Sequence, residues 1–264
     1  MQLSLLYEKK YYNFTLIELL IVIAVITILL ALLFPSLQQA KLIAKQIVCA
    51  SNMRQTVIAA FLYSQEHNGT YCSNYTCTDS RYVPWQTFLS GTQGDKASGN
   101  ELGNGPVYLK RGDVYGCPAN RSYYKERSNF GISGSGFGVY GGDPWGNVYK
   151  LNQNFTATIT TTENNKPYFR LHYLQKIRSP ENLVLYADCI KTGIYLTEDF
   201  PTSPSWEPYK GGFCEGRIHL HHVGNKANAT FYDGHVKAMN QLELNNSASK
   251  VTRFISASGV EINL

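Results

Sequence analysis

The chain has 264 residues and a formal net charge of +5, and hydrophobic residues make up 44% of it. This length is enough to bury a core, and the composition fits a folded protein that is neither disordered nor multi-spanning. The lysines and arginines are scattered singly, whereas nucleic-acid-binding proteins usually concentrate them in a patch. We therefore expect no nucleic-acid partner.

The first predicted element is an apolar segment long enough to cross a membrane. Residues Phe14 to Phe34 read FTLIELLIVIAVITILLALLF and include one charged side chain, Glu18. As a helix rising about 1.5 Å per residue, this segment spans a bilayer core of roughly 30 Å. Lys9 and Lys10 precede it, so the positive-inside rule predicts a cytoplasmic N-terminus with the remaining chain outside. The run is too long for a cleaved secretory signal and lacks a small-residue cleavage pattern.

Glu18 needs an explanation, because a carboxylate in an otherwise apolar helix is costly in lipid. One explanation is that Glu18 lies near enough to the membrane interface to reach water or to stay protonated. The other is that a second molecule supplies a positive charge at the same depth.

The sequence FTLIELLIVIAVI resembles the N-terminal signature of type IV prepilins and type II secretion pseudopilins. The resemblance implies that residues 1–13 are a leader, that prepilin peptidase cuts between Asn13 and Phe14, and that the new Phe14 amine is methylated. It also implies that Glu18 pairs with the Phe14 ammonium of a neighbouring subunit, an ion pair suited to fixing register. Pro35 stands where many pilins have a helix-kinking proline. The family usually has Gly where this chain has Asn13, and an uncut chain would remain a single-pass membrane protein.

The helical pattern continues beyond the apolar segment. Apolar residues recur at spacings of three, four or seven; they are Ala40, Ile43, Ile47, Ala50, Val57 and Phe61. Asn68-Gly69 then marks the end of the helix. We predict a helix over 14–66 whose second half packs this stripe against a globular head formed by residues 67–264.

The head is predicted to be an antiparallel β-sheet, which makes the fold α+β. Strand-like runs occupy residues 157–162, 181–189 and 227–239. Asp233-Gly234 lies within the last run and indicates a hairpin turn in which both residues have φ > 0. The Gly-rich stretch 129–147 contains GxGxxG without a following helix, so we expect a surface loop there and not a dinucleotide site.

Two sets of residues are candidates for disulfides or metal binding. The cysteines are even in number, which is compatible with three disulfides in an exported head or with buried thiols; they are Cys49, Cys72, Cys77, Cys117, Cys189 and Cys214. A divalent metal is the only cofactor considered, with Asp188, His222, Asp233 and His235 as its candidate ligands. The alternative is that these residues are turn residues and satisfied surface histidines.

The neighbouring histidines argue against a metal cluster on an extended strand. His219 and His221 have the same parity, so His222 is expected to face the other way. No segment of the sequence resembles a Ser-His-Asp or HExxH catalytic motif in the structural setting that such a motif requires. We therefore expect that the protein is not an enzyme.

Further segments resemble a large bacterial pilin-like family. In that family a His is followed nine residues later by Asp-Gly, and HHVGNKANATFYDGHV is similar, with ten residues between His222 and Asp233. Three other segments resemble intermediate blocks of the family: VCASNMRQ (48–55), GCPAN (116–120) and IRSPENLVLYADC (177–189).

The residues and the two resemblances favour a structural subunit of a type IV pilus-like filament (a fimbrium) or a type II secretion pseudopilus. Its expected partners are other filament subunits, prepilin peptidase and the inner membrane. The N-terminus would be cytoplasmic, and the head would be periplasmic or on the cell surface after assembly. The alternative is a single-pass anchored module whose head binds a glycan or another ligand without assembling into filaments.

Overall fold

A computed structural model describes residues 14–76, 82–91, 106–110, 113–119, 137–140, 156–160, 168–191, 205–206 and 216–264. The chain divides into two compact units, Met1–Lys41 and Leu42–Leu264, and each is described by itself. The predicted leader with Asn13, and the candidate disulfide residues Cys77 and Cys214, lie outside the described residues.

The helix α1, Leu16–Glu66, begins at a capping box. The Thr15 backbone N–H donates to a carboxylate oxygen of Glu18 at 2.8 Å, and the Glu18 N–H donates to the Thr15 hydroxyl oxygen at 3.3 Å. Each residue thus satisfies a backbone donor that the first turn of a helix leaves without an intrahelical partner. The helix is unbroken at Pro35, which lies inside it.

The end of α1 confirms the predicted stop. Asn68 and Gly69 have φ angles of 53° and 74°, and the Gly69 N–H donates back to the Ser64 carbonyl at 2.7 Å. A left-handed residue after the last turn is a common way to satisfy the final carbonyls of a helix.

The N-terminal unit contains the apolar part of α1. One 18-residue window of the helix has a mean hydropathy of 3.2, and none of that window is buried. By length and composition, the helix can cross a membrane. The described side chains from Phe14 to Lys41 are all exposed, which is the opposite of what a soluble core helix shows.

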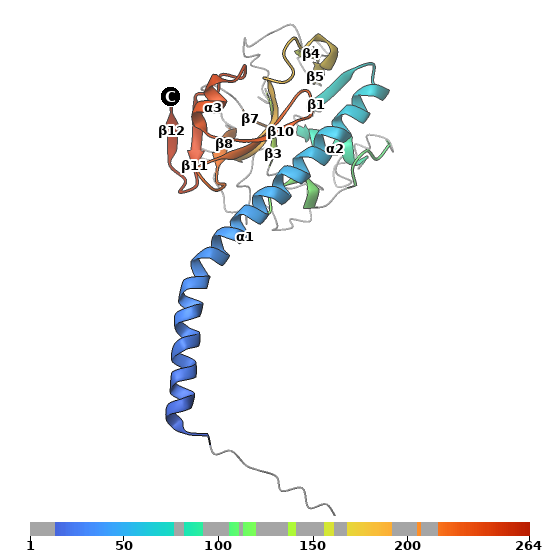
Figure 1. Cartoon of the computed structure of the whole chain (residues 1–264). Coiled ribbons are helices and arrows are strands. Elements are labelled where there is room, and N and C mark those ends of the chain that lie inside the picture. The colour runs from blue at the N-terminus through green and yellow to red at the C-terminus, as the bar shows by residue number, and fades with distance from the viewer. Residues whose placement is uncertain are drawn as a thin grey trace, which may run out of the picture. The chain divides into compact units, whose positions relative to one another are not determined.

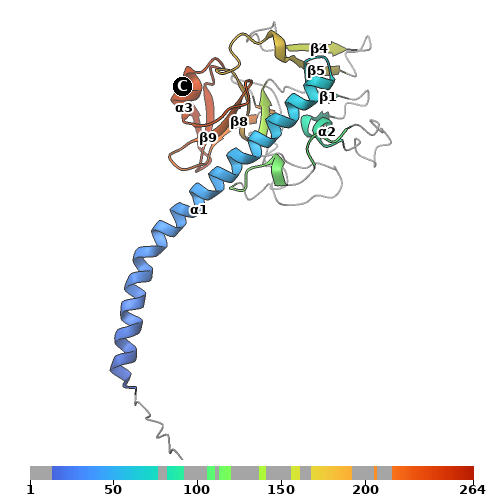
Figure 2. The same ribbon diagram turned by 45° about the vertical axis from the view of Figure 1, so that its right-hand side comes forward.

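The head unit has an α+β fold with two β-sheets. The smaller sheet is antiparallel with strand order β2-β1-β5-β4; these strands are β1 Thr70–Thr76, β2 Tyr82–Pro84, β4 Thr156–Thr160 and β5 Tyr168–Tyr173. Figures 1 and 2 show β1, β4 and β5 grouped near the C-terminal end of α1.

The larger sheet has the order β10-β9-β6-β8-β11-β12. Its strands are β6 Val184–Lys191, β8 Gly216–Leu220, β9 Ala227–Phe231, β10 Val236–Met239, β11 Arg253–Ser256 and β12 Glu261–Asn263. The pair β3 (Phe137–Tyr140) and β7 (Ser205–Trp206) joins it through β6. Most pairs are antiparallel, as predicted, whereas β8–β11 and β3–β7 are parallel.

Short helices complete the described part of the head. The α-helices are α2 Trp85–Ser90 and α3 Gln241–Asn246, and the 3₁₀ helices are η2 Asp113–Tyr115 and η4 Leu174–Lys176. The Asn240 side chain and Glu243 form a capping box at the start of α3.

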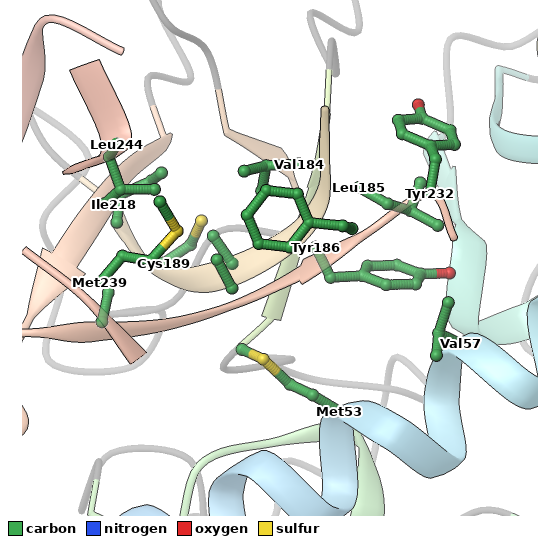
Figure 3. Packing of buried hydrophobic residues seen from close by; sticks show 14 of the residues in the cluster. Met53, Val57, Val184, Leu185, Tyr186, Cys189, Ile218, Tyr232, Met239 and Leu244 are labelled. Carbon is green, nitrogen blue, oxygen red and sulfur yellow. The ribbon is translucent and has the colours of Figure 1, made fainter. Parts of the chain in front are cut away.

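The core joins the second half of α1 to strand β6. Met53 and Val57 are fully buried in one cluster with Leu185 and Tyr186, and Figure 3 shows them rising from the helix toward these side chains. The helix face that packs is rotated from the predicted one. Ile47, expected in the stripe, is 63% exposed, and the buried positions include polar Asn52 and Thr56. The buried face could not be found by counting the spacing of apolar residues, because several of its residues are small or polar.

The predicted stripe is therefore wrong at Ala40, Ile43 and Ile47, which are exposed, while Val57 is buried and Ala50 and Phe61 are partly buried. The correct face contains the buried residues Cys49, Asn52, Met53, Thr56, Val57, Ala59, Ala60 and Ser64.

The predicted hairpin at Asp233-Gly234 is present, but its turn differs from the expectation. β9 and β10 pair in the expected antiparallel register, and only Gly234 has positive φ, at 93°. The four residues between the strands make a longer loop, closed by a Phe231 N–H to His235 carbonyl bond of 2.9 Å. Such a loop needs one left-handed residue, not two.

The prediction of a surface loop over 129–147 is wrong in part, since strand β3 lies within this range.

Candidate functional site

Four buried side chains from distant parts of the head chain converge on one point. The Sγ atoms of Cys49 and Cys117, a carboxylate oxygen of Asp188 and a ring nitrogen of His222 all lie within 4.8 Å of one another. All four residues are buried. They belong to the unit Leu42–Leu264, and they come from α1, the segment after η2, β6 and the segment after β8.

The α1 helix positions both sulfurs. Cys49 lies on the buried face of the helix, one turn before Asn52. The Asn52 side-chain amide donates to the Gly116 carbonyl at 3.1 Å, which fixes the residue that precedes Cys117. The Ala119 backbone N–H in turn lies 3.4 Å from Cys117 Sγ. The helix and the segment after η2 are thus held together where the two cysteines meet.

The larger sheet positions Asp188 and His222. Asp188 lies within β6, and its Oδ2 accepts the backbone N–H of Asn228 on β9 at 2.8 Å. His222 pairs with Lys226 across a tight turn, with the His222 N–H donating to the Lys226 carbonyl at 2.9 Å. Gly224 and Asn225 in that turn have φ angles of 76° and 52°, the left-handed conformation that glycine and asparagine tolerate best.

The distances within the group are short. His222 Nε2 lies 3.0 Å from Asp188 Oδ2 and 3.6 Å from Cys117 Sγ. Cys49 Sγ lies 3.2 Å from Asp188 Oδ1. The two carboxylate oxygens of Asp188 therefore contact different residues, Oδ2 facing His222 and Oδ1 facing Cys49. The Nε2 atom of His222 contacts both Asp188 and Cys117.

The surroundings shift the pKa values of the two cysteines in opposite directions. The hydrogen bond from Cys49 lowers the pKa of Cys117 to about 4, against the effect of burial, and hydrogen bonds from His221 and His222 add to the lowering. Burial and the neighbouring Cys117 raise the pKa of Cys49 well above its ordinary value. Cys49 Sγ donates to Asp188 Oδ1, whereas Cys117 Sγ accepts the Ala119 N–H and lies beside ring nitrogens of His221 and His222.

The imidazole and the carboxylate stabilise each other's charged forms. Burial lowers the pKa of His222, but hydrogen bonds to Asp188 and Cys117 outweigh it and raise that pKa to about 10. Burial likewise raises the pKa of Asp188, but the charges of His221 and His222 and the Asn228 N–H bring it below its ordinary value. The buried carboxylate and imidazole therefore form a mutually stabilised pair beside the two sulfurs.

His221 forms an outer contact to the group. Its Nε2 lies 3.1 Å from Cys117 Sγ, and its Nδ1 lies 3.0 Å from the His219 carbonyl oxygen. Both neighbours are acceptors, so both ring nitrogens of His221 suit an N–H. Burial and the nearby His221 lower the pKa of His219 to about 3, so that ring stays neutral.

The arrangement does not form a nucleophilic triad. In a Cys-His-Asp triad the imidazole uses one nitrogen for the carboxylate and the other for the sulfur. Here Nε2 of His222 faces both Asp188 and Cys117. The sulfurs are also fully buried, so a substrate has no direct approach to them. Atoms that converge on a common centre are what a bound cation requires.

The structure divides the predicted metal ligands into two pairs. Asp188 and His222 belong to the converging group, as predicted. Asp233 and His235 form a separate, partly exposed pair at the β9–β10 turn, with Nδ1 and Oδ1 2.6 Å apart, and they are not part of the group. The Asp233 carboxylate also accepts the His235 N–H, which is the role of a turn residue.

The sequence analysis did not assign Cys49, Cys117 and His221 to this site. The even number of cysteines favours disulfides or buried thiols, and the chain has no CxxC spacing that would indicate a metal. The expectation that His222 faces away from His221 was wrong, because β8 ends at Leu220 and strand alternation stops before both. The four similar segments 48–55, 116–120, 177–189 and HHVGNKANATFYDGHV each contain one of the four residues, which is the signal that could have found the group.

The predicted disulfides are not formed at the two cysteines of the site, which are both free thiols. Cys72 and Cys189 are buried elsewhere in the head. Comparison with protein-family models, curated proteins and solved structures gave no match to this chain.

We predict that Asp188→Asn strongly destabilises the head, because the substitution leaves buried His222 without its carboxylate. Breaking one side of a buried ion pair costs roughly 3–5 kcal/mol. Urea unfolding of the full chain in detergent, followed by near-ultraviolet circular dichroism, measures the change.

Asp233→Asn is the matched control, since it removes a carboxylate from the second Asp–His pair, which is partly exposed. Its cost is expected to stay under about 1 kcal/mol. Equal losses for the two variants would contradict the assigned importance of Asp188.

Proposed function

We propose that the chain is a structural subunit of a type IV pilus-like or type II secretion pseudopilus filament. The observation that carries the proposal is the N-terminal part of α1, which is apolar and unburied and whose first turn lies in the FTLIE sequence at Phe14–Glu18. The role is one of assembly and not of catalysis.

The exposed apolar residues of α1 need a non-aqueous environment. Each large aliphatic side chain moved out of water contributes about 1.5–3 kcal/mol, and 14 of the 19 residues from Leu16 to Phe34 are Leu, Ile or Val. Lipid provides that environment before assembly, and the helices of neighbouring subunits provide it in a filament. The same apolar segment of α1 can thus be stable in lipid and among the helices of a filament. This supports a subunit that moves from the inner membrane into a polymer.

Glu18 has a local role that is compatible with a role in assembly. Its carboxylate accepts the N–H and the hydroxyl of Thr15, at 2.8 and 2.7 Å. This holds the carboxylate at the first turn of the helix, where the helix dipole favours a negative charge. In the proposed filament, the same carboxylate also meets the Phe14 ammonium of a neighbouring subunit.

The mature N-terminus distinguishes a filament subunit from an anchored binding module. We predict that the protein recovered from membranes begins at Phe14 with a methylated amine, because the FTLIE sequence resembles the substrate of prepilin peptidase. Intact-mass and N-terminal peptide analysis measure both modifications. Asn13→Gly restores the residue that the resembled family usually has and serves as a positive control for cutting. A wild-type chain that keeps its leader while Asn13→Gly is cut would contradict the proposal.

A pair of Glu18 variants separates helix capping from charge pairing. Glu18→Gln keeps an oxygen that can accept from Thr15 but loses the charge, whereas Thr15→Ala keeps the charge and loses the hydroxyl. We predict that Glu18→Gln leaves the chain in the membrane with a folded head and reduces sheared filaments at least tenfold, because the pair with Phe14 is lost. Thr15→Ala is expected to assemble. Normal filaments from Glu18→Gln would show that Glu18 only caps the helix.

A further inference from the structure

We propose that Cys49, Cys117, Asp188 and His222 bind one divalent transition-metal ion, Zn²⁺, in a closed structural site of the head. The proposal concerns the head unit alone, so it holds or fails independently of filament assembly.

The spacing of the four side chains fits a tetrahedral zinc ion. With Zn–S bonds near 2.3 Å and Zn–N or Zn–O bonds near 2.0–2.2 Å, the edges of the tetrahedron are roughly 3.4–3.8 Å. The distances among the ligand atoms include 3.0, 3.2 and 3.6 Å, and none exceeds 4.8 Å. One donor atom from each of the four residues therefore lies close to the spacing that a tetrahedral zinc ion requires, and side-chain adjustments of up to about 1 Å would complete the fit.

The types of ligand atom favour zinc over the hard cations. Two sulfurs, one imidazole nitrogen and one carboxylate oxygen are the donors that zinc accepts in tetrahedral sites, whereas Ca²⁺ and Mg²⁺ take oxygen ligands. All four donors come from the protein and all are buried, as in structural sites that keep no open position for water or substrate.

Binding of the ion replaces the protons that the metal-free site holds. The cysteines would coordinate as thiolates and His222 through a neutral Nε2, and every proton that these donor atoms carry before binding leaves to solvent. Cys117 and Asp188 coordinate as anions. The hydrogen bonds among the four groups are thus exchanged for bonds to one ion, with no change in oxidation state.

The surroundings already hold the ligands in place. Asn228 on β9 donates its backbone N–H to Asp188 Oδ2, and its side chain donates to the Gln46 carbonyl of α1 at 3.1 Å. His221 and the Ala119 N–H both lie at Cys117 Sγ, where they can offset the charge of a metal-bound thiolate. Outer contacts of this kind fix the orientation of metal ligands.

The role that follows is to hold together elements that are far apart in sequence. An ion bound by Cys49, Cys117, Asp188 and His222 ties α1 to the segment after η2 and to the larger sheet. Because the unfolded chain does not bring these four residues together, the free energy of binding the ion adds to the stability of the folded head. The competing outcome in an exported head is a Cys49–Cys117 disulfide, which would use both sulfurs and exclude the metal.

The test is the zinc content of the full chain, extracted in detergent without chelators and with reductant present throughout. Elemental mass spectrometry is expected to find about one zinc per chain. Replacement of zinc by Co²⁺ is expected to give the visible bands of tetrahedral cobalt and a thiolate-to-metal absorption in the near ultraviolet. Both measurements use wild-type protein, so they do not depend on whether a variant folds.

Matched variants locate the ion. Cys117→Ser and His222→Ala are expected to lose zinc. Cys189→Ser removes another buried cysteine, His235→Ala removes a histidine of the separate pair, and both are expected to keep it. His221→Ala leaves all four ligands in place and is expected to weaken zinc affinity by roughly 10- to 100-fold.

Three results would overturn the proposal. The first is wild-type protein without zinc in which Cys49 and Cys117 are recovered as a disulfide-linked peptide from non-reduced membranes. The second is zinc-free protein with both thiols free. The third is zinc that persists in Cys117→Ser and His222→Ala at the level of the controls. One equivalent of iron lost in the same two variants would support the site and overturn the choice of zinc.

Discussion

The meeting of Cys49, Cys117, Asp188 and His222 is the constraint on which the head most depends. A helix, a short segment after η2 and two strand regions each contribute one side chain to a point from which water is excluded. Buried charges are costly unless each has a partner. The hydrogen bonds from Asn228, Asn52 and His221 surround the group and keep each member in place. Apolar parts of the core, such as the packing of Met53 and Val57 against Leu185, would tolerate volume-conserving change more easily than this point.

The α1 helix combines two kinds of surface along its length. Its N-terminal part, within Met1–Lys41, exposes aliphatic side chains and suits lipid or other helices. From Cys49 onward, its buried face is built of small and polar residues that approach the sheet closely and form specific hydrogen bonds. In the proposed filament, the first surface would serve polymerisation, while the second fixes the helix into its own head. A metal-bound Cys49 would strengthen the second function.

The parts of the fold with strong local signals could be predicted from the sequence. The long apolar run, the Asn68-Gly69 stop and the strands around 184 and 227–239 all have such signals, and each is present. The buried face of α1 could not be predicted, because periodicity does not register how polar residues on it are satisfied. Asn52 donates to the Gly116 carbonyl outside the helix, and the Thr56 hydroxyl donates back to the Asn52 carbonyl within it. Nor could the group of four buried side chains, because its residues are spread over 174 positions (222 − 49 + 1) and only the fold brings them together. The sequence suggested that His222 and Asp188 lie together, as they do, but it grouped them with Asp233 and His235 and not with the two cysteines.

X-ray absorption at the zinc edge tests the central claim about the head most directly, since it reports the ligand atoms of the bound ion without any substitution. For the full chain extracted in detergent, the account predicts a four-coordinate shell with two sulfurs at about 2.3 Å and two nitrogen or oxygen atoms at about 2.0–2.2 Å. A shell containing only nitrogen and oxygen would place the zinc elsewhere, at surface histidines, and would contradict the account.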